Sequence, residues 1–235
     1  MDAGPRPNFP CAFGDMRLTP ILLAAIALAA PAAPAFAHHL GVIVPQDDEV
    51  TAVFKRVRAL LSEGRFDLAA RECEDTPLGR RLAEASRGGP PDVRGEVLGA
   101  LARHDAPGTE LALLRFFLVV VRNLAGEALR RVNDPGLSER AQGEQALKLL
   151  AAGWRYYNLV DYTLYRREAK AALRVRLAFE DVEFALGGSR AQQARYDGAA
   201  ARLALRKFQA LLGGILEATA PAAHRSSLTC EALLA

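Results

Sequence analysis

Three features that would place this chain in a special class are scarce or missing. Only 3 of the 235 residues are cysteine, which excludes a small scaffold held together by many disulfides. The formal net charge is only +3, which excludes the dense basic face of a nucleic-acid-binding domain. Hydrophobic residues make up 51% of the chain and charged residues 24%, which excludes an intrinsically disordered chain. The composition is that of a folded chain with a sizeable core.

Familiar catalytic motifs are also missing from the sequence. It contains no G-x-S-x-G elbow, no phosphate-binding loop, no H-E-x-x-H helix, no C-x-x-C pair and no haem attachment site. The stretch after His104 has no further histidine until His224, which argues against a di-iron bundle built from Glu-x-x-His motifs. We therefore expect the protein not to be an enzyme.

The first part of the chain has the pattern of a secretory signal peptide. Met16 and Arg17 precede the apolar run PILLAAIALAAPAAPA over 20–35, and small-x-small cleavage patterns end at Ala35 and Ala37. We expect residues 1–37 to be a signal peptide with an overlong start, the true start being Met16. A retained membrane anchor is the alternative, but an apolar part of about 11–15 residues is short for a span of about 20. The sequence predicts a periplasmic or secreted protein.

Removal of that segment leaves two cysteines, Cys73 and Cys230, in a compartment where disulfides persist. A bridge between them would connect the tail of the chain to the second predicted helix. Because it closes a long loop, it would restrict the unfolded chain and so stabilise the folded state. The alternative is two separate thiols, with Cys73 buried as a small apolar residue.

The rest of the chain is predicted to be all-α. No run alternates β-branched and aromatic residues with a period of two, whereas Ala, Leu, Arg and Glu are abundant. We expect a helical bundle of six to eight antiparallel helices, with residues 38–89 forming an N-terminal helical hairpin region and residues 90–235 the main bundle. The expected helices are 47–62, 66–74, 78–86, 92–103, 109–132, 138–186 and 190–217, with a break in the sixth near Arg166–Glu168, because one straight helix over 138–186 would exceed the size of the domain.

The most apolar part of the mature chain lies within the expected helix 109–132. A membrane span would fit its hydrophobicity, but Arg115 and Arg122 enclose only six apolar residues, and an arginine near a bilayer centre is costly. We expect a buried central helix here and no transmembrane span in the mature chain.

An aromatic and acidic face in the segment 154–168 is the first candidate site. Tyr157, Asp161, Tyr165 and Glu168 recur every three or four residues, so they share one face of a helix. Phenolate and carboxylate oxygens are hard ligands that suit a hard cation such as ferric iron. The alternative is that the rings pack in the core and Asp161 forms ion pairs with nearby arginines.

The new N-terminus is the second candidate site. Cleavage after Ala37 leaves His38 first, so its amine and imidazole can chelate copper, with His39 next to it. Cleavage after Ala35 instead places His38 third, a position that binds Cu(II) or Ni(II) through amine, amide and imidazole nitrogens. The alternative is a solvated pair of histidines at a frayed end.

These patterns predict an exported, all-helical binding or accessory protein that handles iron or copper in the cell envelope. The alternative is a periplasmic helical module that binds a protein partner of the envelope and has no ligand of its own. Neither hypothesis involves nucleic acid.

Overall fold

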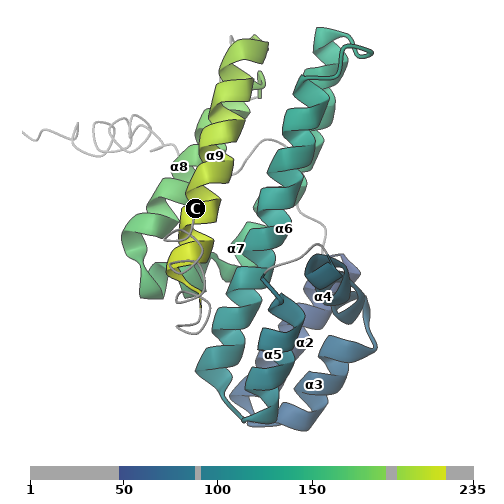
Figure 1. Cartoon of the computed structure of the whole chain (residues 1–235), viewed down its shortest axis with the longest axis vertical. Helices are drawn as coiled ribbons and strands as arrows, with labels where there is room; N and C mark the ends of the chain where they lie inside the picture. Colours follow the sequence, from purple (N-terminus) through teal and green to yellow (C-terminus); the bar gives the residue numbers. More distant parts are fainter. Residues whose placement is uncertain (1–47, 88–90, 189–194, 221–235) are drawn as a thin grey trace, which may run out of the picture. The chain divides into compact units, whose positions relative to one another are not determined.

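Eight α-helices make up the part of the chain that the structure, a computed structural model, describes: residues 48–87, 91–188 and 195–220 (Figure 1). No strand occurs in these ranges, which confirms the predicted all-α class. The helices are α2 (Glu49–Ser62), α3 (Phe66–Glu74), α4 (Pro77–Arg87), α5 (Val93–Ala102), α6 (Ala106–Val132), α7 (Glu139–Arg167), α8 (Ala169–Ala185) and α9 (Gly198–Ala218).

Side-chain caps decide where several of these helices begin. The carboxylate of Asp48 accepts a hydrogen bond of 2.8 Å from the backbone N–H of Thr51 and so caps α2. Asp105 does the same for α6 through the N–H of Gly108, at 2.9 Å. Helix α6 therefore begins three residues before the predicted position 109, because Pro107 is tolerated in a first turn, where its missing N–H costs nothing.

The long helical region 138–186 is interrupted at Glu168, within the segment predicted for the break. Glu168 has φ −149° and ψ 81°, an extended conformation that ends α7 and precedes α8. The last helix begins at Gly198, later than the predicted 190, where Asp197 caps it through the N–H groups of Ala199 and Ala200. Residues 189–194 lie outside the described ranges.

Helix α6 is the centre of the packing. It contacts α4, α5, α7 and α9, and its middle turns, including Phe116 and Phe117, are buried. This confirms the prediction of a buried central helix. Helices α2 to α5 pack on one another, α5 also packs on α6, and α8 packs between α7 and α9. None of the helices in the described ranges is both long and apolar enough to cross a membrane.

One continuous core runs through these helices. It includes residues before and after the predicted boundary near Gly88, so α2–α4 and α5–α9 share their hydrophobic interior. An aromatic group lies within it: Trp154 of α7 contacts the rings of Tyr157 and Phe179, and Phe179 of α8 contacts Phe208 of α9 with ring centroids 4.6 Å apart. The edge-on contacts of Phe179 with Trp154 and with Phe208 join α7, α8 and α9.

Candidate binding cleft

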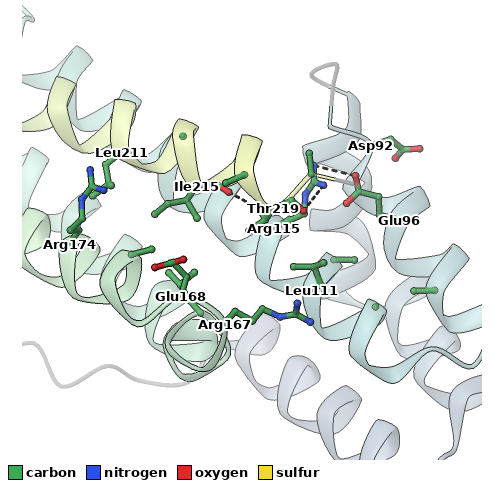
Figure 2. A pocket seen from close by; sticks show the side chains of 18 of the residues that line it. Asp92, Glu96, Leu111, Arg115, Arg167, Glu168, Arg174, Leu211, Ile215 and Thr219 are labelled. Carbon is green, nitrogen blue, oxygen red and sulfur yellow. Dashed lines mark hydrogen bonds and ion pairs between the residues drawn. The ribbon is translucent and has the colours of Figure 1, made fainter. Parts of the chain in front are cut away.

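A cleft of about 1320 Å³ opens between α5, α6, α8 and α9, with the end of α7 at its edge (Figure 2). Its volume exceeds the usual range of small-molecule sites, about 300–1,000 Å³. The first turns of α5, α6 and α8 and the last turn of α9 all meet at this cleft. Several helix ends therefore lie at the cleft, and the backbone N–H and C=O groups of a helix end have no partners within their own helix.

Apolar residues form part of the cleft wall, between the charged side chains. Leu111 and Ala112 of α6, Leu164 of α7, Ala171 of α8 and Ile215 of α9 line it, and all but Leu111 are buried. Small residues form much of the remaining wall, and Gly214 of α9 has no side-chain or backbone atom near the place where a Cβ would stand. The partly exposed Leu111 and Leu211 present the apolar surface that a ligand can cover.

A buried arginine closes one end of the cleft. The guanidinium of Arg115, whose side chain is 3% exposed, lies 3.3 Å from the carboxylate of Glu96 on α5 and donates a hydrogen bond of 3.3 Å to the carbonyl of Thr219 at the end of α9 (Figure 2). Burial lowers the pKa of Arg115, and the negative charge of Glu96 opposes this shift. The Nε of Arg115 has no hydrogen-bond partner among the described residues. The side chain ties α5, α6 and α9 together and presents a positive charge at the cleft.

Two more cations stand on α8, one helical turn apart. Lys170 and Arg174 line the cleft and are exposed, and their side chains make neither an ion pair nor a hydrogen bond with any residue in the described ranges. They follow the start of α8, where Glu168 makes no side-chain cap. The N–H groups of this first turn carry a partial positive charge that attracts anions. Figure 2 shows Arg174 reaching toward Leu211 of α9, so a charged and an apolar group meet there.

The predicted oxygen-ligand residues do not converge on this cleft as a group. Tyr157 is fully buried, and its hydroxyl donates a hydrogen bond of 3.2 Å to the carbonyl of Ala172 on α8. Burial, with a further contribution from Asp161, raises the pKa of Tyr157 far above that of a free phenol. Asp161 accepts a hydrogen bond of 3.0 Å from Arg176 of α8. Tyr157 and Asp161 therefore join α7 to α8. This is the packing and ion pairing of the alternative interpretation, except that Asp161 pairs with Arg176 of α8 and not with an arginine of its own segment.

The two remaining residues of that predicted face lie elsewhere. Tyr165 is 51% exposed, with the guanidinium of Arg176 above its ring, and Glu168 stands at the break between α7 and α8, where it lines the cleft. Within the described parts of the chain, no three His, Cys, Asp or Glu side chains are grouped so that they could hold a metal ion. The iron hypothesis stays a prediction that these contacts do not support.

The other predicted sites depend on residues outside the described ranges. His38, His39 and Cys230 all lie there, so the copper site and the Cys73–Cys230 bridge stay predictions. Cys73 itself has no exposed surface, and burial raises the pKa of its thiol to about 12, with Glu72 and Glu74 adding to the shift.

The basic residues of the cleft were not predicted as site residues from the sequence. Arg115 was noted only as an interruption of an apolar run, and nothing distinguished Lys170 and Arg174 from the other 28 basic residues. An arginine between Leu114 and Phe116 was the available signal, because a charge within a buried stretch needs a partner.

Comparisons with family models, with curated proteins and with solved structures found no match. Function has to be inferred from the chemistry of the cleft and from the pattern of the sequence.

Proposed function

We propose that this protein is an exported binding protein of the cell envelope and that its cleft takes an organic anion with an apolar body. The observation that carries the proposal is the pair Lys170 and Arg174 beside apolar wall residues, with no ion partner among the described residues. A carboxylate or sulfonate placed there gains two cations and the N-terminus of α8, while its apolar part covers Leu111 and Leu211.

Charge balance at the cleft agrees with a negative ligand. Five basic residues line it against three acidic ones, and the buried pair of Arg115 and Glu96 neutralises one of each. A cationic ligand would meet the excess of positive charge and would be repelled. The place of action comes from the sequence alone: the predicted signal peptide over residues 1–37 supports export.

A helical interaction module is the second candidate function. Its support is a set of large apolar side chains that are at least 49% exposed on the last three helices: Tyr162 and Tyr165 of α7, Leu173, Leu177 and Phe184 of α8, and Leu203 of α9. Exposed apolar groups that lie next to one another, as Leu173 and Leu177 do one helical turn apart, are typical of surfaces that bind a partner. Metal handling at His38 and His39 is a third candidate, which rests on the sequence alone.

Binding of the fluorescent anion 1-anilinonaphthalene-8-sulfonate tests the first proposal, since the probe combines a sulfonate with an apolar body. We expect the double variant Lys170→Glu/Arg174→Glu to weaken its binding at least about tenfold, because two attractions become repulsions. The matched control is Arg140→Glu/Lys148→Glu, which changes net charge equally on exposed positions of α7 away from the cleft.

The control should bind the probe as wild type does, and circular dichroism should show that both variants keep their helices. Equal binding by wild type and both variants would mean that the probe does not use the cleft, and the proposal would fail. Metal analysis of the protein recovered from the periplasm separates the third candidate: bound copper lost on replacing His38 and His39 would support it.

A further inference from the structure

A second, apolar groove runs between α8 and α9 and joins the cleft. Its volume is about 470 Å³, and Leu177, Phe184 and Leu203 line it with 49%, 65% and 55% of their surfaces exposed. Arg174 and Leu211 line both the groove and the cleft, so the two concavities meet at these residues. Helices α8 and α9, whose residues line the groove, lie side by side (Figure 1).

The length and chemistry of the groove differ from those of the cleft. From Arg174 to Phe184 the axis of α8 rises by about 15 Å. Most of the residues that line this distance are apolar, and the charged ones are Arg174 at the end shared with the cleft, Lys207 and Asp181. A chain that is charged at one end and apolar over the rest matches this order of residues.

We propose that the groove holds the hydrocarbon chain of a long-chain carboxylate whose head group lies in the cleft at Lys170 and Arg174. The carboxylate accepts hydrogen bonds from these two cations, and the chain covers Leu177, Phe184 and Leu203, which water otherwise contacts. This inference rests on the proposed function and adds to it the class of ligand, a fatty acid or another acyl chain that ends in a carboxylate.

Charge complementarity favours this occupant over an uncharged one. The head-group end presents Arg174, which lines both the groove and the cleft, and Lys170 one helical turn before it, and neither forms an ion pair among the residues that the structure describes. Leaving large apolar side chains exposed is costly in water, and covering them is the main source of affinity for a flexible hydrocarbon.

Calorimetric titration with butyrate, octanoate and laurate tests the inference. The sample is the protein that a bacterial host produces from the whole gene, with whatever processing the host carries out. Complete burial would raise affinity about fourfold for each added methylene, and an open groove about twofold. We therefore expect laurate to bind on the order of a hundredfold more tightly than butyrate. Laurate binding no more tightly than butyrate would overturn the inference.

Two leucines give a matched pair of variants. Leu203 and Leu173 are both 55% exposed, but only Leu203 lines the groove. Leu203→Glu should weaken laurate binding about tenfold or more and leave butyrate unchanged, whereas Leu173→Glu should leave both within about twofold of wild type. Equal losses in both variants would overturn the inference. If Leu203→Glu does not fold, Phe184→Asp makes the same test at a position that is 65% exposed.

The outcomes separate this inference from the proposed function. If short and long carboxylates bind equally and Lys170→Glu/Arg174→Glu abolishes both, the cleft function stands and the acyl-chain inference fails. If no carboxylate and no sulfonate binds, both fail. Sedimentation velocity tests whether a second copy of the chain occupies the groove instead. If the protein forms a dimer that Leu203→Glu dissociates and that laurate does not dissociate, the groove serves self-association and the inference is overturned.

Discussion

Asp48 connects the start of α2 to the middle of α7. One oxygen of its carboxylate accepts the N–H of Thr51, and the other accepts the hydroxyl of Tyr156 at 2.8 Å, with Arg155 at 3.8 Å. Burial alone would raise the pKa of Asp48, but the bonds from Thr51 and Tyr156 and the charge of Arg155 outweigh it and hold the pKa below its usual value. The same bond and burial raise the pKa of Tyr156 to about 12.

This lowered pKa predicts a pH-dependent stability. Because the folded protein prefers the ionised Asp48, its contribution is present above the pKa of an unfolded aspartate, about 3.9, and is lost as pH falls through the lower folded value. Asp48→Asn keeps a good cap but not the charge, so it should cost up to about 1 kcal/mol at pH 7 and less near pH 2.5. Urea unfolding at the two pH values measures this, and an equal cost at both would contradict the role of the charge.

Asp48→Ala serves as the comparison, because it removes the cap as well as the charge. It should cost about 1 kcal/mol beyond Asp48→Asn at pH 7, the usual value of an N-cap.

At the scale of elements, the break at Glu168 sets the direction of α8. The backbone there is extended, and the N–H of Glu168 still bonds to the carbonyl of Leu164, while the N–H of Ala172 bonds to the carbonyl of Glu168. Both helices thus end and begin with normal hydrogen bonds. The break places Tyr157 against Ala172 and Asp161 against Arg176, so α8 packs back along α7.

Proline substitutions test whether the break belongs to the folded state. Ala169 is the first residue of α8, where proline fits and restricts the unfolded chain, so Ala169→Pro should leave stability unchanged or raise it by about 0.4–1 kcal/mol. Leu173→Pro, also at an exposed position but in the second turn, should cost about 3 kcal/mol. Thermal unfolding followed by circular dichroism compares them. A large loss for Ala169→Pro would indicate that α7 and α8 form one continuous helix.

Most elements could be predicted from the sequence because local signals mark their ends. Gly64 and Pro77 bound α3, whose predicted limits Phe66–Glu74 agree with the structure, and Asp134 and Pro135 mark the turn before α7. Length alone required a break in 138–186, since it exceeded the size of the domain. Partners were harder to predict: Asp161 pairs with Arg176, 15 residues away on another helix, and not with an arginine of its own segment.

At the scale of the whole molecule, the cleft depends on helices that are distant in sequence. Arg115 and Thr219 lie 104 positions apart, yet one hydrogen bond joins them. A periodic pattern reports which face of a helix is apolar but not which faces meet around an open space, so the cleft could not be predicted. The acidic and aromatic face of α7 was detectable, but the pattern did not distinguish a ligand set from packing.

Export is the prediction that concerns the whole chain. We expect protein recovered from the periplasm of an expressing bacterium to begin at His38 or, after the earlier cut, at Phe36. N-terminal sequencing and intact mass measure this, and a parallel sample with Ala35 and Ala37 both replaced by Glu should remain unprocessed. Wild-type protein that keeps Met1 or Met16 would contradict the predicted signal peptide and, with it, the placement in the cell envelope.

Trp154 is the only tryptophan of the chain, and a relay of rings leads from it through Phe179 to Phe208, which lines the groove between α8 and α9. Trp154 is therefore an intrinsic fluorescent reporter of changes at this groove. A guest that shifts Phe208 should change the wavelength or intensity of indole emission without any attached dye, whereas one confined to the Arg115 end should leave that spectrum unaltered.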